Sequence, residues 1–140
     1  MNSNVNTTPE EVATTILIAD DDEDILALVD RALSESGYEV LLARDGAGAL
    51  ATARERKPAL ALLDIAMPEL DGYEVTSALK NDPATKDTIV ILFTARSEAS
   101  DVEKGYEAGA DDYIMKPFTL KTLQGRVLAA LERAKGGAEN

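Results

Sequence analysis

The chain has 140 residues, 14 basic and 26 acidic side chains for a net charge of −12, and no histidine, cysteine or tryptophan. That length suits one domain with its own hydrophobic core. The charge disfavours general nucleic-acid binding, because a phosphate backbone would repel the chain. The missing residue types exclude the usual zinc sites and the cysteine and Ser-His-Asp nucleophile systems. Carboxylate and carbonyl oxygens remain as metal ligands, which favours a hard cation such as Mg²⁺ or Ca²⁺.

Composition divides the chain into three segments. Residues 1–14 are polar and are expected to form a disordered N-terminal lead-in. Residues 15–135 form the expected domain, and residues 136–140 are expected to form a flexible tail. The first fifteen residues lack the basic start and apolar stretch of a secretory signal. No apolar run reaches the roughly 20 residues that membrane insertion requires. We therefore expect a cytoplasmic protein.

Short apolar runs alternate with helical patterns along this domain. The runs are mostly continuous, as in strands buried on both faces of a sheet: Ile16–Ala19, Tyr38–Ala43, Leu60–Leu63, Ile89–Phe93 and Tyr113–Met115. A helix is expected after each run, near residues 25–33, 46–56, 73–80, 97–108 and 120–131. Strict alternation predicts an α/β fold in which helices cover both faces of a parallel five-stranded sheet.

Chemically active side chains follow directly after four of the runs. Asp20 and Asp21 follow the first, Asp64 the third, Thr94 the fourth and Lys116 the fifth. The carboxyl ends of parallel strands share one edge of a sheet, where ligands bind. Two carboxylates about 5 Å apart repel by roughly 3 kcal/mol at an effective dielectric of about 20, so a divalent cation or the lysine must offset them. Carboxylates, Mg²⁺, lysine and a hydroxyl suit phosphoryl transfer, in which aspartate can be the nucleophile.

Each of these residues also has a structural interpretation. The acids of the run 20–24 suit the first turn of a helix, which is the preferred interpretation for residues 22–24. Asp64 could form a turn, Thr94 could belong to the sheet, and Lys116 could be a solvated loop residue. The joint placement at four strand ends favours a functional site over these separate roles.

Four motifs together resemble the receiver domain of bacterial two-component response regulators, which has a CheY-like fold. They are Ile16 to Asp22, Leu63 to Gly72, Phe93 to Ala95, and Gly109 to Phe118, within a resemblance that covers about residues 15–134. The resemblance implies a three-layer, doubly wound (βα)5 flavodoxin-like fold with strand order 2-1-3-4-5. It also implies a signalling phosphoacceptor, with self-catalysed phosphorylation and dephosphorylation, rather than an enzyme.

The resemblance assigns the metal and acceptor roles residue by residue. Asp64 is similar to the phosphoacceptor, and Asp20 and Asp21 to the acidic pair that holds Mg²⁺, with Asp21 the more direct ligand. The backbone carbonyl of Ala66 would be a further ligand. Lys116 is similar to the lysine that pairs with the acceptor carboxylate and then with the phosphate.

Further positions take switching and supporting roles by the same resemblance. Thr94 is similar to the switch hydroxyl and Tyr113 to the switch aromatic, which changes rotamer when Thr94 moves. The side chains at Ala66 and Arg96 would flank the route of the water that removes the phosphoryl group. The bond between Lys116 and Pro117 would be cis, and Gly72 would permit the turn that opens the third helix.

The expected partners follow from this role. A sensor histidine kinase or phosphotransfer protein would donate the phosphoryl group, and a downstream effector protein or a missing output domain would read the surface of the fourth helix, fifth strand and fifth helix. Neither membrane insertion nor direct nucleic-acid binding by this domain is expected. A phosphorylation-dependent homodimer is compatible with the ionic residues Asp111, Asp112, Arg126 and Arg133. Val102 and Thr122 depart from that dimer pattern, where related receivers have a basic and an acidic partner.

Two other functions remain open at this stage. A Mg²⁺-dependent phosphatase of the haloacid-dehalogenase type would need a second aspartate two residues after its nucleophile, a place that Ala66 occupies here. A pseudo-receiver would act as an interaction module that never accepts phosphate. Phosphoryl acceptance and turnover of a phosphomonoester distinguish the three.

Overall fold

The computed structural model describes residues 13–96 and 98–138, so the predicted lead-in up to residue 12 and the last two residues lie outside it. Five strands alternate with five helices, in the chain order β1 (Thr15–Ala19), α1 (Glu23–Glu35), β2 (Glu39–Ala43), α2 (Gly46–Arg56), β3 (Leu60–Leu63), α3 (Gly72–Lys80), β4 (Ile89–Thr94), α4 (Ala99–Ala108), β5 (Asp112–Met115) and α5 (Leu120–Ala138).

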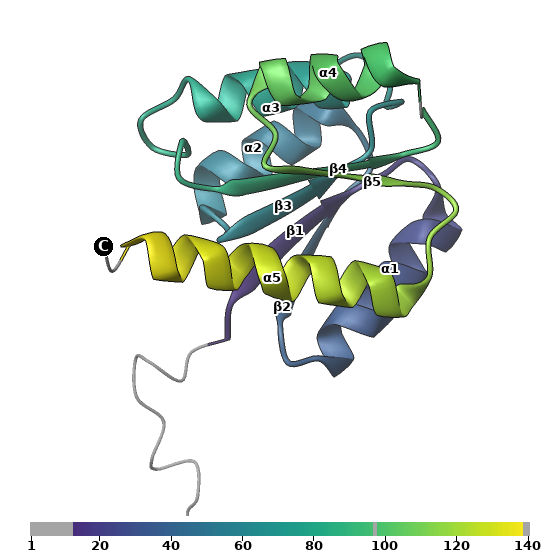
Figure 1. The fold of residues 1–140 in the computed structure, drawn as a ribbon, viewed down its shortest axis with the longest axis vertical. Coiled ribbons are helices and arrows are strands. Elements are labelled where there is room, and N and C mark those ends of the chain that lie inside the picture. The colour runs from purple at the N-terminus through teal and green to yellow at the C-terminus, as the bar shows by residue number, and fades with distance from the viewer. Residues whose placement is uncertain (1–12, 97, 139–140) are drawn as a thin grey trace, which may run out of the picture.

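The strands form one parallel sheet in the order β2-β1-β3-β4-β5. Helices α1 and α5 cover one face of this sheet, and α2, α3 and α4 cover the other (Figure 1). The predicted three-layer, doubly wound (βα)5 flavodoxin-like fold is therefore confirmed. Strand order reverses between β1 and β3, which is where ligands bind in sheets of this kind.

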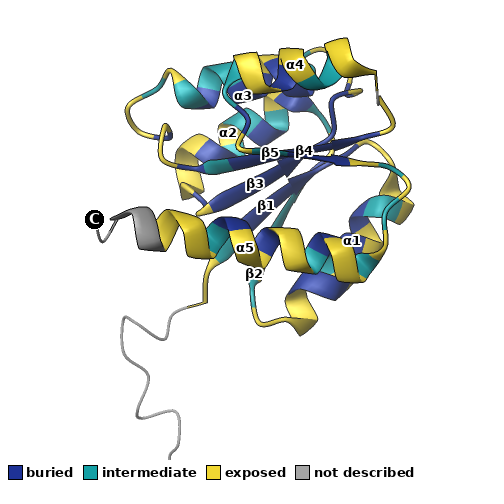
Figure 2. Cartoon of the chain, in the orientation of Figure 1, coloured by how far each residue is buried: buried dark blue, intermediate teal, exposed yellow. Residues whose placement is uncertain are grey.

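The core is divided into two layers by the alternation of side chains along each strand. Leu17 and Leu63 point toward α2, α3 and α4, whereas Ile16 and Ile18 point toward α1 and α5. The central strands are buried throughout and the helices expose their outer faces (Figure 2). The central strands β1, β3 and β4 thus have the two-sided burial that their sequence predicts, whereas the edge strands β2 and β5 are only partly buried.

Element ends differ from the sequence prediction where polar groups complete a strand or helix. Strand β4 continues to Thr94, one residue beyond its apolar run, because its ladder with β5 pairs Thr94 with Met115. Helix α1 begins at Glu23, after the Asp22 side chain accepts hydrogen bonds from two backbone amides. This cap confirms the structural interpretation of that part of the acidic run. Helix α5 extends to Ala138, past the expected domain boundary at residue 135, because glycine weakens a helix without forbidding it.

Glycine is required at position 72 because the backbone of another segment passes close to it, and not because the chain makes an unusual turn there. Its φ is not among the positive values, which for glycine occur at Gly37 and Gly109. A Cβ at Gly72 would lie 2.6 Å from the Asp64 carbonyl oxygen and 2.8 Å from the Ile65 Cα. The expectation that Gly72 permits a turn is thus corrected, since what it permits is contact between α3 and the segment that follows Asp64.

Replacing Gly72 with alanine is expected to lower the free energy of unfolding by about 2 kcal/mol, because backbone atoms must move to admit the methyl group. Gly125→Ala is the matched control, since nothing lies within 4 Å of a Cβ there. In Gly125→Ala, the free energy of unfolding should instead rise by up to about 1 kcal/mol, because alanine has the higher helix propensity. Urea unfolding of both variants checks the pair, and equal effects would contradict the packing argument.

Candidate functional site

The candidate site lies at the carboxyl edge of the sheet, where backbone hydrogen bonds carry the strand pairing beyond the last strand residues. The amide of Asp64 donates to the Ala19 carbonyl at 2.9 Å, and the amide of Lys116 donates to the Thr94 carbonyl at 2.8 Å. The amide of Asp20 donates to the end of β2 at 3.2 Å. The side chains at the carboxyl ends of β1, β3, β4 and β5 are therefore fixed in register with one another.

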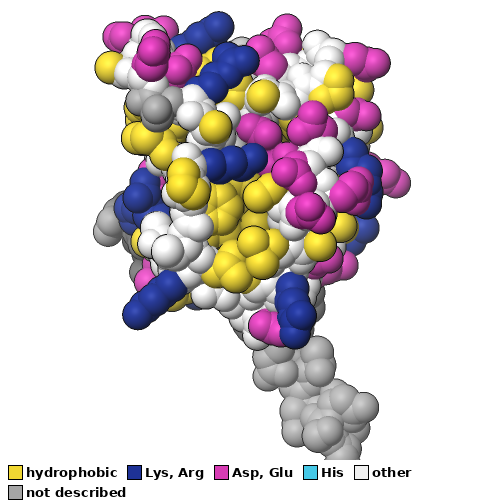
Figure 3. Space-filling model, turned by 90° about the vertical axis from the view of Figure 1, so that its right-hand side faces the viewer, with side chains coloured by type: hydrophobic (Ala, Val, Ile, Leu, Met, Phe, Trp, Pro, Cys, Tyr) yellow, Lys and Arg dark blue, Asp and Glu magenta, His cyan; other side chains and the backbone are white. Residues whose placement is uncertain are grey.

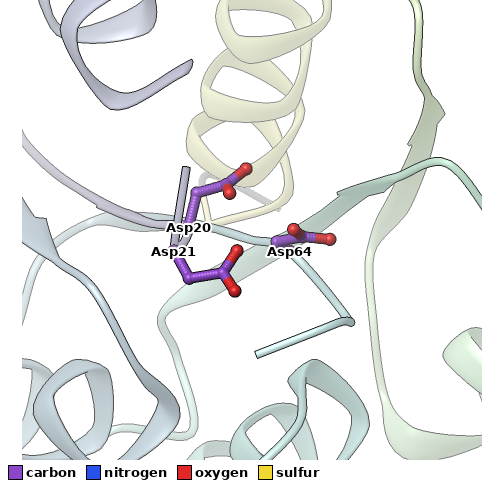
Figure 4. Close-up of side chains that lie close together, drawn as sticks. All are labelled: Asp20, Asp21 and Asp64. Carbon is purple, nitrogen blue, oxygen red and sulfur yellow. The ribbon is translucent and has the colours of Figure 1, made fainter. Parts of the chain in front are cut away.

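Three carboxylates meet at this edge. Asp20, Asp21 and Asp64 each offer an oxygen, and these oxygens all lie within 4.8 Å of one another. The three side chains gather around one small space, with Asp20 and Asp21 on one side and Asp64 on the other (Figure 4). Asp20 is fully buried and Asp64 is 5 % exposed, whereas Asp21 is exposed. The sequence prediction that these acids come together at the strand ends is met by this geometry.

The Lys116 ammonium joins the two buried acids. Its Nζ lies 2.7 Å from Asp20 Oδ2 and 3.3 Å from Asp64 Oδ2, so its shorter contact is with Asp20 rather than with the expected acceptor. The ammonium also lies 5.0 Å from the centroid of the Phe93 ring, an attractive cation–π distance. The bond from Lys116 to Pro117 is cis, as expected.

Burial and neighbouring charges have opposing effects on the pKa values of Asp64 and Lys116. Desolvation, together with the charge of Asp20, raises the pKa of Asp64 above its ordinary value even though Lys116 pulls it down. Burial alone would lower the pKa of Lys116, but its hydrogen bond to Asp20 and the charges of Asp64 and Asp20 outweigh burial and raise it. The lysine is therefore cationic at neutral pH. Its single positive charge does not balance the three carboxylates of the cluster.

This donor set fits a hard divalent cation. Mg²⁺ binds through a small number of carboxylates plus water and phosphate oxygens, and an exposed carboxylate beside two buried ones leaves room for both. Ala66 lies in the turn after β3, where its amide donates to Asp64 Oδ1 at 3.3 Å. Its side chain is exposed.

The two expected switch residues lie beside one another on adjacent strands. Thr94 is 1 % exposed at the end of β4, and its hydroxyl accepts a hydrogen bond from the Arg96 amide at 3.4 Å. Tyr113 on β5 is 5 % exposed, and its hydroxyl donates to the Arg96 carbonyl at 2.7 Å. Arg96 itself is exposed, so its backbone rather than its side chain links the two residues.

The ionic residues of the α4-β5-α5 surface form pairs within the chain. Arg126 binds Asp112 through two hydrogen bonds of 2.8 and 2.6 Å. Asp111 lies 2.9 Å from Lys80 Nζ and also accepts from the Val90 amide. Both acids expected to serve a dimer are therefore already paired in the single chain.

One contact near the site was missed from the sequence. The Tyr73 hydroxyl, at the start of α3, donates to the Asp101 carbonyl in the first turn of α4 at 3.0 Å. The aromatic residue directly after the Asp71-Gly72 turn is the signal in the sequence, but its partner is 28 residues away.

A pH dependence of stability follows from the raised pKa of Asp64. For an acid whose folded pKa exceeds its unfolded value, ionisation lowers stability as pH rises through this range, and the loss is complete above the folded pKa. Asp64→Asn is therefore expected to unfold at a higher urea concentration than the native chain at pH 7. The gain should shrink as pH falls toward the ordinary value of 3.8. Urea midpoints between pH 4 and pH 7 measure it, and a gain that grows with acid would contradict the assignment.

Comparison with known proteins agrees with this arrangement. Residues 16–128 match the model of the family described as the response regulator receiver domain. The transcriptional regulatory protein PrrA of Mycobacterium tuberculosis is 48 % identical over 118 residues, which cover 84 % of this chain and 50 % of PrrA. The chain thus spans about half the length of the curated relatives it matches.

Solved structures share the fold closely. A CheY-like response regulator receiver domain protein from Methanospirillum hungatei superimposes with a TM-score of 0.84 at 30 % identity, covering 89 % of this chain and 98 % of that one. The BeF3-activated receiver domain of DrrB gives 0.80 at 36 % identity, covering 86 % and 99 %. With its sheet order, its three clustered aspartates and the family match over 16–128, the chain belongs to the receiver domains of two-component response regulators.

Proposed function

We propose that Asp64 accepts a phosphoryl group in a Mg²⁺-dependent reaction, with Asp20, Asp21, Asp64 and the Ala66 carbonyl as the metal ligands. The observation that carries this proposal is the cluster in Figure 4, in which three carboxylate oxygens lie within 4.8 Å of one another. Carboxylates gathered this closely repel one another, which destabilises the fold. A metal and a phosphoryl group would offset that repulsion.

Each residue of the site would have its own role in phosphoryl transfer. A carboxylate oxygen of Asp64 attacks the phosphorus of a phosphohistidine, the P–N bond breaks, and its electron pair stays on the donor's imidazole. Bound Mg²⁺ would supply neutralisation of the charge that spreads over the phosphoryl oxygens. Lys116 lies between Asp20 and Asp64 and would stabilise the same charge. The Thr94 hydroxyl would turn to a phosphoryl oxygen, and Tyr113 would follow it.

An apolar surface beside Asp64 suits a macromolecular phosphodonor. A hollow of about 330 Å³ is lined by Ile25, Leu28, Ala95, Lys116, Pro117 and Phe118. Figure 3 views this edge of the molecule and shows hydrophobic side chains beside a group of acidic ones. Leu28 is 47 % exposed, which favours contact with a partner. A sensor histidine kinase or phosphotransfer protein could bury this surface while presenting its phosphohistidine.

An effector protein or an output domain would bind the phosphorylated form of the domain. The match spans only about half the length of the curated relatives, which are transcriptional regulators, and this supports an output domain. A phosphorylation-dependent homodimer through α4, β5 and α5 would have to re-use the internal pair of Arg126 and Asp112. No helix among the described residues is long and apolar enough to span a bilayer.

The test is incubation of the purified chain with a small phosphodonor such as acetyl phosphate, with and without Mg²⁺, followed by intact mass measurement. One added phosphoryl group is expected, with Mg²⁺ only. No gain in mass, with normal folding, would favour the pseudo-receiver. Sustained hydrolysis of a generic phosphomonoester would favour the phosphatase, which the alanine at position 66 argues against.

A further inference from the structure

Helix α4 is held to the domain by few apolar contacts. Among its residues, all of which are described, only Gly105 is buried, and Val102 and Ala108 pack partly against the core. A Cβ at Gly105 would lie 2.9 Å from a Leu92 methyl carbon and 3.1 Å from the Tyr113 ring, so the helix approaches the sheet closely at that point. Polar contacts at its N-terminal end add to this attachment.

Two tyrosine hydroxyls supply these polar contacts. Tyr113 donates to the Arg96 carbonyl just before α4 at 2.7 Å, and Tyr73 donates to the Asp101 carbonyl in its first turn at 3.0 Å. Both rings are buried, with exposures of 4 % for Tyr73 and 5 % for Tyr113. Burial, with the neighbouring Tyr73 and Asp101 as further causes, raises the pKa of Tyr113. Its phenol therefore stays protonated and able to donate.

Tyr73 is tied directly to the segment that follows Asp64. It comes immediately after Gly72, whose amide donates to the Ile65 carbonyl at 3.0 Å and whose α-carbon packs against the Asp64 backbone. The backbone at the start of α3, which carries Tyr73, is therefore held against the turn after β3. The Tyr73 hydroxyl extends this link to the first turn of α4.

The fold thus contains two links between the acceptor site and α4. One runs from Thr94 through the backbone of Arg96, after the end of β4, to Tyr113 on β5, and the other runs from Asp64 through Gly72 to Tyr73. On the basis of the proposed function, we propose that Tyr73 is a positioning residue of the phosphorylation switch. Its hydroxyl fixes the first turn of α4 in the placement that favours phosphoryl binding at Asp64.

Tyr73→Phe isolates the hydroxyl, because phenylalanine keeps the ring in the core and beneath the Lys104 ammonium, which lies 4.7 Å from its centroid. Tyr106→Phe is the matched control, the same change at a tyrosine of α4 that is 47 % exposed. Each protein is titrated with Mg²⁺ alone and then with beryllofluoride, a phosphoryl mimic, at saturating Mg²⁺. Backbone amide exchange of residues 98–104 is followed by mass spectrometry.

Tyr73→Phe is expected to weaken beryllofluoride binding about fivefold, the effect of one lost hydrogen bond. It should leave Mg²⁺ affinity unchanged and speed exchange in the first turn of α4. Tyr106→Phe should behave as the native chain does. Unchanged beryllofluoride affinity in Tyr73→Phe would overturn the inference, as would a parallel loss of Mg²⁺ affinity, which would mean that the acidic site itself is distorted. A native chain that fails to bind beryllofluoride would instead overturn the proposed function on which the inference rests.

Discussion

Replacing Asp64 with asparagine is expected to reduce phosphoryl incorporation to background. The amide is nearly the same size and keeps an oxygen near the Ala66 amide, which lies 3.3 Å from Asp64 Oδ1. It carries no negative charge, so it neither attacks phosphorus nor balances a divalent cation. The variant is expected to fold, since the raised pKa of Asp64 indicates that its charge destabilises the native state. Intact mass after incubation with acetyl phosphate and Mg²⁺ measures the loss.

Asp24→Asn is the matched control for this experiment. Asp24 belongs to the same acidic run as Asp20 and Asp21, the proposed metal ligands, but lies exposed in the first turn of α1. It should accept phosphate at the native rate, with a change in stability of no more than about 1 kcal/mol from the weakened helix-dipole interaction. Phosphorylation that persists in Asp64→Asn would move the acceptor to another residue. Loss of phosphorylation in both variants would point to net charge rather than to a specific site.

Replacing Lys116 with methionine is expected to slow phosphoryl transfer about a hundredfold, the usual effect of removing one preorganised cation or donor from developing negative charge. The same change should lower the free energy of unfolding by about 2 kcal/mol, because Asp20 and Asp64 lose their shared counter-charge. Asp20 is fully buried and cannot recover that interaction from water. Methionine keeps an unbranched side chain of similar length but loses the cation–π contact of the ammonium with Phe93.

Magnesium separates the two effects of the Lys116 change. Added Mg²⁺ should restore much of the lost stability by neutralising the acids, while the transfer rate stays low because the ammonium itself is missing. Urea unfolding with and without Mg²⁺, together with phosphorylation kinetics, measures both. Lys121→Met, at an exposed lysine in the first turn of α5, should change neither. A native transfer rate in Lys116→Met would show that the lysine is only a structural counter-ion.

Several features of the site were predictable because they depend on local order in the chain. A polar residue that directly follows a buried strand must emerge at the carboxyl edge of a parallel sheet, and this rule brought Asp20, Asp64 and Lys116 together. The helix-capping role of Asp22 was predictable for the same reason, since an N-cap bonds amides only two or three residues away.

Other features depend on contacts between distant segments and were not predictable. The shorter contact of Lys116 with Asp20 rather than Asp64 joins the end of the edge strand β5 to the end of β1, and the two residues are 96 positions apart in the chain. The packing role of Gly72 depends on how closely α3 approaches the turn after β3. The internal pairing of Asp111 with Lys80 likewise joins the residue before β5 to the end of α3.

The sequence by itself determined the α/β class, the alternation of elements and the identity of the acidic cluster, because hydrophobic period and strand-end position are properties of neighbouring residues. Only the tertiary structure decided which charges are buried, which partners they take and how α4 is held. Those properties depend on desolvation and on distances between segments that lie far apart in the chain. The coupling proposed for Tyr73 also depends on the tertiary structure, because its hydroxyl finds its hydrogen-bond partner only where α3 contacts α4.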